Sequence, residues 1–154
     1  MLKLQHLTKR FGAAPLFTDL CMEVDAPVVL WAPSGWGKTT LLRTIARTLA
    51  ERQRLVAVVD ERGELFPPEQ PLPPLERVGG VDKARAVQMA LRTLAPQVIL
   101  LDEPTSNLDS LNEGIILKSL KESAEEKTIV LVSHRVSTMN VANVVYEMEN
   151  GRIS

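Results

Sequence analysis

A glycine-rich stretch near the amino terminus could bind phosphate groups. Residues 30–42 read LWAPSGWGKTTLL, and in this stretch Gly35 and Gly37 precede Lys38 and Thr39. A loop of this type binds phosphate oxygens with backbone N–H groups at a helix N-terminus, while the lysine contacts the β- and γ-phosphates and the hydroxyl binds magnesium. The spacing therefore predicts a P-loop that binds a nucleoside triphosphate with Mg²⁺.

Two residues of this loop are unusual. Ala32 stands where the P-loop pattern has its first glycine, but alanine costs little there unless the backbone needs a positive φ. Trp36 lies in the middle of the loop, so its side chain either packs away from the phosphates or lies over them. We expect the loop to bind nucleotide despite both. The residues expected to contact it are Pro33, Ser34, Gly35, Trp36, Gly37, Lys38, Thr39 and Thr40.

Two carboxylates follow an apolar run farther along the chain. The segment VILLDEP predicts a buried strand that ends at Asp102, with Glu103 next to it. Carboxylates at strand ends belong to the ligand-binding edge of a parallel sheet. Asp102 could therefore hold magnesium together with Thr39, and Glu103 could orient an attacking water or accept its proton. The alternative is that both are surface acids that end the strand.

A histidine is expected at the same edge. His134 follows the apolar strand TIVLVS directly. A histidine in this position is usually structural, but beside Lys38, Asp102 and Glu103 it is predicted to contact the γ-phosphate. Lys38, Glu103 and His134 are therefore the candidate catalytic residues.

Hydrophobic periodicity predicts the elements that position these residues. The alternation in LKLQHL and a second strand over 16–24 predict a small antiparallel element at the N-terminus. Helical spacing follows the P-loop, and continuous apolar runs predict strands that are buried on both faces. Helices are expected at 39–51, 82–95, 110–126 and 135–143, and an Asn-Gly turn at 150–151. Alternating strands and helices predict an α/β fold with a mostly parallel sheet and flanking helices.

Composition favours one domain over residues 1–154 and excludes several functions. The net charge of −1 gives no reason to expect nucleic acid as a partner. No apolar run approaches the roughly 20 residues of a spanning helix, and no signal peptide is evident, so we expect a cytoplasmic protein. Cys21 is the single cysteine and is expected to be buried on a strand, whereas His6 is expected to be exposed.

The segments APSGWGKTTLL, VILLDEPTSNLD and VLVSHR together resemble the ATP-binding cassette (ABC) ATPases. The resemblance covers nearly the whole chain. It implies an ATPase that binds MgATP at a composite site, formed with a second copy or with another ABC-type subunit. It also implies a transmembrane permease as a partner, and with it a location at the inner face of the membrane. By this resemblance Phe11 stacks on adenine, residues 106–109 form the D-loop at the dimer interface, and His134 is the switch histidine. Phe11 could instead be a turn residue packed on the core.

The chain is shorter than the family pattern between the P-loop and the strand of Asp102. Asp102 follows Thr39 by only 63 positions, and residues 67–74 carry five of the 10 prolines. Such a proline segment can be neither a helix nor a central strand, so it is expected to be an extended connection. The helical subdomain that normally docks onto transmembrane partners should therefore be reduced or absent. A connection and signature-like loop over 64–81 would stand in its place.

Two further positions differ from the family. Asp60 stands where the family has a glutamine that contacts magnesium, and it could reach a magnesium-bound water or be a solvated strand-end acid. The signature loop Leu-Ser-Gly-Gly-Gln is replaced by RVGGV over 77–81. Gly79 and Gly80 could still donate backbone hydrogen bonds to the partner's nucleotide, but Val78 lacks the hydroxyl. These changes predict slow hydrolysis.

Two other interpretations stay open. The chain could be an ATP-gated dimerisation module with little hydrolysis and no transporter coupling, which the altered signature and the reduced subdomain favour. Glu103 and His134 favour the enzyme. A weaker resemblance of VVDERGEL and ALRTLAPQVILLDE to secretion- and sporulation-type ring ATPases ranks low, because those proteins lack the PTSNLD pattern.

Overall fold

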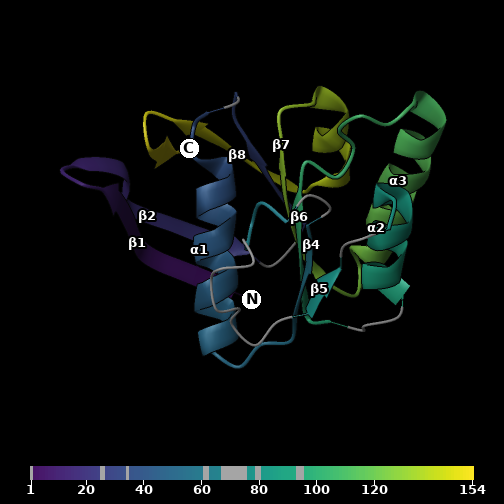
Figure 1. Cartoon of the computed structure of the whole chain (residues 1–154), viewed down its shortest axis with the longest axis horizontal. Helices are drawn as coiled ribbons and strands as arrows, with labels where there is room; N and C mark the ends of the chain where they lie inside the picture. The colour runs from purple at the N-terminus through teal and green to yellow at the C-terminus, as the bar shows by residue number, and fades with distance from the viewer. Residues whose placement is uncertain are drawn as a thin grey trace.

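A seven-stranded, mostly parallel sheet forms the centre of the molecule (Figure 1). The computed structural model describes residues 2–24, 27–33, 35–60, 63–66, 76–78, 81–92 and 96–154. The strands are β1 (Leu2–Phe11), β2 (Ala14–Val24), β3 (Val28–Trp31), β4 (Val56–Val59), β5 (Glu76–Val78), β6 (Val98–Asp102), β7 (Thr128–Ser133), β8 (Val144–Glu149) and β9 (Arg152–Ile153). The helices are α1 (Lys38–Glu51), α2 (Lys83–Arg92), α3 (Ser110–Ser123) and the short 3₁₀ helix η1 (Val136–Val141).

The sheet has the strand order β5-β4-β6-β7-β3-β8-β9. All neighbouring pairs are parallel except β8 and β9, which run antiparallel through the predicted Asn-Gly turn. A separate antiparallel hairpin of β1 and β2 lies at the N-terminal end of the chain. The predicted α/β fold, with a small antiparallel element before a parallel sheet, is confirmed.

Helices cover both faces of the sheet, as Figure 1 shows, with α1 on one side and α2 and α3 on the other. Alternate residues of each central strand point to opposite faces, so Val28 and Leu30 join the core under α1, whereas Val29 joins the core under α2 and α3. Apolar residues are needed at every position of such a strand, which is why the central strands appear as continuous apolar runs.

The N-terminal hairpin packs its apolar side onto the core under α1. Leu20, Met22 and Val24 alternate along β2 and are buried there. Cys21 lies between them and is therefore exposed, so the prediction that it is buried is wrong. The phase of the alternation decides this position, and it leaves Cys21 on the solvent side of the hairpin. His6 is exposed, as predicted.

A strand appears where only a connection was expected. Residues 76–78 form β5, which pairs with β4 in parallel at the edge of the sheet. Val78 is buried in the core under α2 and α3, with 7% of its surface exposed. Most of the proline segment, together with Gly79 and Gly80, lies outside the described residues. The boundaries proposed for this connection and the single-domain organisation stay predictions.

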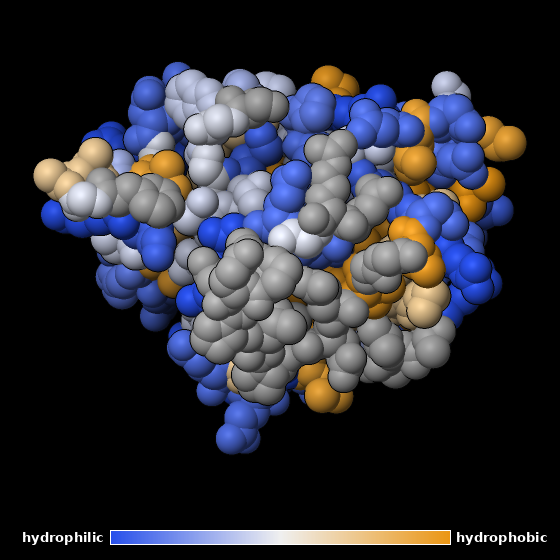
Figure 2. All heavy atoms as spheres, viewed as in Figure 1, coloured by the Kyte–Doolittle hydropathy of each residue, from blue (hydrophilic) through white to orange (hydrophobic). Residues whose placement is uncertain are grey.

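Several of the exposed apolar residues belong to α2 and α3. Figure 2 shows hydrophobic side chains mainly over the part of this face that carries α2 and α3, whereas the hairpin and α1 present mostly hydrophilic residues. Met89 of α2 and Leu111 and Ile115 of α3 are exposed. Among the described residues, no helix is long and apolar enough to cross a membrane.

Asp60, at the end of β4, binds the backbone of residues 64–66. Its carboxylate accepts hydrogen bonds from the backbone N–H groups of Glu64, Leu65 and Phe66 at 3.0, 3.1 and 3.4 Å. Leu65 and Phe66 are fully buried in the core, and Arg43 of α1 donates to the backbone carbonyls of Leu65 and Glu64. Asp60 itself is only 6% exposed, so the expectation of a solvated acid is wrong.

Replacement of Asp60 with alanine should destabilise the fold. The change leaves three backbone N–H groups without their acceptor at or next to the buried Leu65 and Phe66, which we expect to lower the free energy of unfolding by about 3 kcal/mol. Asp60→Asn keeps one acceptor oxygen and should lose less. Thermal and urea unfolding measure both, with Glu51→Ala at an exposed position of α1 as the control. An Asp60→Ala protein as stable as the wild type would contradict this role.

Candidate functional site

The predicted site residues surround one cavity at the carboxyl ends of the parallel strands. The cavity has a volume of about 610 Å³. It is lined by Leu16, Gly35, Gly37, Lys38, Thr39, Thr40, Asp60, Glu64, Lys83, Asp102, Glu103, Ser106, Asn107 and His134. Because β3, β4, β6 and β7 run in the same direction, the segments that follow them meet at this edge.

The loop between β3 and α1 has the backbone of a phosphate-binding loop. Gly35 and Gly37 have φ values of 86° and 83°, a left-handed conformation that favours glycine. A side chain at Gly37 would also collide with Leu16, whose Cδ2 would lie 2.9 Å from the added Cβ. Ala32 is fully buried and is not among the residues with positive φ, so alanine fits the position where the pattern has glycine.

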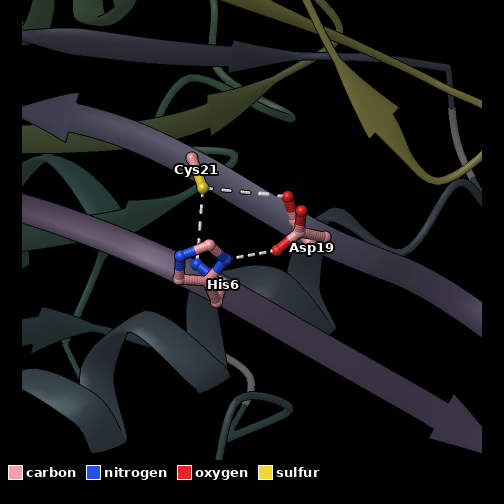
Figure 3. Close-up of side chains that lie close together, drawn as sticks. All are labelled: His6, Asp19 and Cys21. Carbon is pink, nitrogen blue, oxygen red and sulfur yellow. Dashed lines mark hydrogen bonds and ion pairs between the residues drawn. The ribbon is translucent and has the colours of Figure 1, made fainter.

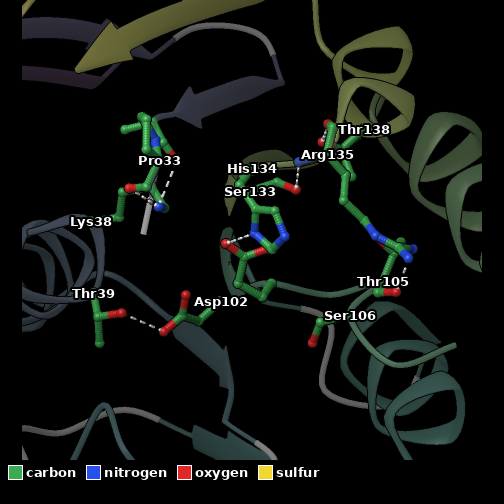
Figure 4. A network of polar contacts seen from close by, with 12 residues as sticks. Pro33, Lys38, Thr39, Asp102, Thr105, Ser106, Ser133, His134, Arg135 and Thr138 are labelled. Atoms are coloured by element: carbon green, nitrogen blue, oxygen red, sulfur yellow. Dashed lines mark hydrogen bonds and ion pairs between the residues drawn. The ribbon is translucent and has the colours of Figure 1, made fainter. Parts of the chain in front are cut away.

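Lys38 extends from the first turn of α1 back toward this loop (Figure 4). Its ammonium donates to the backbone carbonyls of Ala32 at 2.6 Å and Pro33 at 2.8 Å. Burial lowers the pKa of the Lys38 ammonium, while the Glu103 and Asp102 carboxylates act in the opposite direction. A partly desolvated cation that faces a helix N-terminus attracts an anionic ligand strongly.

Thr39 and Asp102 form the pair that could bind a metal. The Thr39 hydroxyl donates to Oδ2 of Asp102 at 2.9 Å (Figure 4). Burial raises the pKa of Asp102, the Thr39 hydrogen bond lowers it, and the carboxylates of Glu103, Asp60 and Glu64 raise it further. Hard oxygen donors next to desolvated negative charge suit Mg²⁺, so the residues present fit this ion.

Glu103 and His134 meet across the cavity. Nδ1 of His134 lies 2.9 Å from Oε1 of Glu103. The other carboxylate oxygen of Glu103 is buried and has no hydrogen-bond partner within the described part of the chain. Glu103 also has a φ of 49°, and its backbone N–H donates to the Val132 carbonyl of β7. This conformation places the carboxylate at the cavity, where Oε1 contacts His134.

Lys83 is a site residue that the sequence did not reveal. It begins α2, is only 6% exposed, and donates to the Glu103 carbonyl at 2.9 Å and to the Ser106 hydroxyl at 2.5 Å. The same ammonium is 3.3 Å from the Ser106 carbonyl. Lys83 thus connects the helix that follows the signature-like segment to the backbone of Glu103. Its position in the first turn of a predicted helix gave no signal of these contacts.

Arg135, directly before η1, binds residues that follow β6 at the same edge of the sheet. Its guanidinium donates to the Thr105 carbonyl at 2.9 Å (Figure 4). It also donates to the Glu113 carboxylate at 2.9 Å. Glu113 also accepts a hydrogen bond from Ser137. Asp109 accepts from the Asn112 backbone N–H at 2.8 Å and caps α3, so this residue of the predicted D-loop has a structural contact within the chain.

Several predicted binding residues do not line this cavity. Trp36 packs against the core and lines a second cavity with Pro15, Leu16 and Asn150. Phe11 ends β1, but its side chain lies outside the described residues, as do Ser34, Gly79 and Gly80. The roles assigned to these residues stay predictions.

Comparisons with known proteins agree with the motifs. No protein-family model matches the chain. A probable ABC transporter ATP-binding/permease protein of Haemophilus influenzae is 65% identical over 57 residues, which is 37% of this chain and 10% of that protein. The alpha-hemolysin translocation ATP-binding protein HlyB of Escherichia coli O157:H7 is 38% identical over 76 residues, which is 49% of this chain and 11% of HlyB. The matches thus span about a tenth of the length of these curated relatives.

The structure matches a solved cassette. The dimeric bacterial ABC transporter cassette MJ0796 superimposes with a TM-score of 0.71 at 16% identity, over 97% of this chain and 94% of that one. The chain has the fold of an ABC transporter cassette. A post-hydrolysis state of the same cassette, bound to ADP and Pi, matches with the same TM-score at 15% identity. The predicted resemblance to ABC ATP-binding proteins is confirmed.

The raised pKa of Asp102 predicts how the stability of this protein depends on pH. A carboxyl whose pKa is higher in the folded than in the unfolded state costs stability once it is ionised, and this cost disappears as the pH falls below the unfolded value. Asp102→Asn should therefore raise the melting temperature at about pH 7.5, with chelator and without nucleotide, and the gain should shrink toward about pH 4. Asp109→Asn, which keeps the cap of α3, is the control. A gain in melting temperature for Asp102→Asn that does not change with pH would contradict a raised pKa of Asp102.

Proposed function

We propose that the chain is an ABC-type ATPase domain that binds MgATP and hydrolyses it to ADP and phosphate, as the energy-coupling part of an ABC transporter. One observation carries the proposal: Lys38, the Thr39–Asp102 pair and the Glu103–His134 pair line a single cavity at one sheet edge. The similarity to ABC transporter ATP-binding proteins supports ATP as the nucleotide.

Each residue has a distinct task in the proposed reaction. Lys38 and the backbone N–H groups of the P-loop bind and orient the β- and γ-phosphates. Thr39 and Asp102 would hold Mg²⁺, which supplies charge neutralisation at the phosphates when it is bound. Glu103 accepts a proton from the attacking water, and His134 orients the Glu103 carboxylate and contacts the γ-phosphate.

Charge in the cavity supports a metal-bound nucleotide over a free one. The lining includes the carboxylates of Asp60, Glu64, Asp102 and Glu103, against the ammonium groups of Lys38 and Lys83. Asp60 is engaged by three backbone N–H groups, whereas Asp102 and Glu103 bring negative charge close to the proposed position of the phosphates. A polyanion enters such a cavity more readily when a divalent cation accompanies it.

The assembly that we propose is a dimer with a second copy or another ABC-type subunit, closed by ATP. The match to a dimeric cassette supports it. In this proposal the chain lies in the cytoplasm and reaches the membrane through a permease partner. The second candidate function is an ATP-gated dimerisation module with little hydrolysis. The buried side chain of Val78 favours this second candidate, because it offers no hydroxyl at the signature position.

Glu103→Gln separates the two candidates. The variant keeps the shape of the side chain but removes the base, so we expect phosphate release to fall at least about 100-fold while ATP binding persists. Steady-state phosphate release and equilibrium ATP binding measure these effects. Lys38→Ala should lose ATP binding itself. A wild type that binds ATP but turns over no faster than Glu103→Gln would favour the dimerisation module, and retained affinity in Lys38→Ala would show that the site is misplaced.

Lys83→Met tests the link between α2 and Glu103. Loss of the ammonium frees the Glu103 and Ser106 carbonyls, so we expect kcat to fall about tenfold with little change in the KM for ATP. Lys118→Met, at an exposed position of α3, is the matched control. Melting temperatures of both variants show whether the folded fraction is equal. An unchanged kcat, or a loss confined to KM, would contradict a role in positioning Glu103.

A further inference from the structure

Three potential metal ligands meet on the exposed side of the N-terminal hairpin, away from the cavity. Figure 3 shows His6 on β1 facing Asp19 and Cys21 on β2. Nδ1 of His6 lies 2.5 Å from Oδ1 of Asp19, and the His6 backbone N–H lies 3.4 Å from Sγ of Cys21. One ligand atom from each residue lies within 4.8 Å of the other two. We propose that these three side chains bind one Zn²⁺ ion.

The hairpin register brings the three side chains together. Residues 5–6 of β1 lie opposite the single residue 21 of β2, and residue 8 of β1 lies opposite residues 18–19 of β2. Two bulges on facing strands thus flank one regular pair, and His6 and Asp19 take positive φ values of 57° and 53°. Bulges redirect side chains relative to the strand alternation. Both residues consequently reach the side on which Cys21 already lies.

Contacts within the hairpin hold this arrangement. The backbone N–H of Asp19 donates to the Thr8 hydroxyl at 3.0 Å, so the bulge of β2 is tied to β1. The thiol of Cys21 lies 3.8 Å from the Asp19 carbonyl. On the opposite side of the hairpin, the buried Leu20 and Met22 anchor β2 in the core under α1. The side chains are therefore carried by two paired strands, one of which is anchored on both sides of Cys21.

The donor types select zinc over magnesium. Imidazole nitrogen, thiolate sulfur and carboxylate oxygen are the ligands of tetrahedral Zn²⁺, whereas Mg²⁺ prefers oxygen alone. Two donors that share a tetrahedral zinc lie about 3.5 Å apart. The His6–Asp19 separation of 2.5 Å is shorter than this value, and all three ligand atoms lie within 4.8 Å of one another, so side-chain rotations would complete the set. The Cys21 thiol releases its proton to solvent on binding, and the fourth position is left to water or to an external ligand.

This site is chemically independent of the nucleotide cavity. None of its three residues lines that cavity. Zinc would join β1 to β2 near the middle of the hairpin and so restrict the segment that leads to the turn after Phe11. The alternative is that His6 and Asp19 form an ion pair and that Cys21 binds nothing. The large exposure of both partners is compatible with such a pair.

Metal titration of the full chain without nucleotide tests the proposal. We expect one Zn²⁺ per chain in calorimetry and, with Co²⁺ as the probe, a thiolate-to-cobalt charge-transfer band in the near ultraviolet. Cys21→Ser should remove this band and weaken Zn²⁺ binding at least tenfold. His6→Gln and Asp19→Asn should each weaken Zn²⁺ binding to a similar extent.

Two controls make the test specific. Gln5→Ala changes an exposed neighbour in the same bulge, and His134→Gln removes the only other histidine of the sequence. Both should leave Zn²⁺ affinity unchanged, and melting temperatures verify that the variants are folded. Absence of the cobalt band in the wild type, or unchanged Zn²⁺ affinity in Cys21→Ser, would overturn the proposal. A loss of affinity in His134→Gln equal to that in His6→Gln would also overturn it.

Discussion

The parallel pairing of β3, β6 and β7 is the constraint on which the candidate site depends. Asp102 pairs with Val132 and Trp31 with Ser133, so the P-loop, the two carboxylates and His134 leave the sheet at the same level. A shift of one residue in either register would turn these side chains toward the opposite face. The buried residues on both faces of each strand prevent such a shift, because it would exchange the cores under α1 and under α2 and α3.

The sequence predicted what depends on local periodicity. The buried strands, α1 and the P-loop glycines follow from apolar runs and spacing, and parallel strands then place Asp102 and His134 at one edge. The role of Asp60 was harder to predict. An acid at the end of a strand gives the same sequence pattern whether it faces a metal or binds nearby backbone N–H groups. Only the burial of Leu65 and Phe66 directs its carboxylate to the backbone. Likewise, the exposure of Cys21 depends on the phase of the alternation along β2. The formation of β5 depends on its pairing with β4, a contact between distant segments.

Lys83 shows how a contact between distant segments changes the meaning of a residue. As part of α2 it is a basic residue in the first turn, a position where the helix dipole does not favour positive charge. The fold offsets this with the Glu103 and Ser106 carbonyls, which surround the buried ammonium. Lys83 thus contacts the backbone of Glu103, which has a left-handed conformation, while His134 contacts its carboxylate. Helix α2, the strand-end carboxylate and the histidine therefore form one connected polar network.

The residues other than glycine that have a positive φ fall into two groups, those in turns and those at the candidate sites. Six residues other than glycine have a positive φ within the described part: His6, Asp19, Gln53, Glu103, Asn107 and Asn150. Gln53 and Asn150 lie in turns that follow α1 and β8, where such values are common. Glu103 and Asn107 line the cavity of the candidate site, and His6 and Asp19 face each other on the hairpin. A strained backbone persists only where the surroundings enforce it. For Glu103 this enforcement comes from β7 and Lys83, and for Asp19 it comes from the hydrogen bond that ties the bulge of β2 to Thr8 of β1.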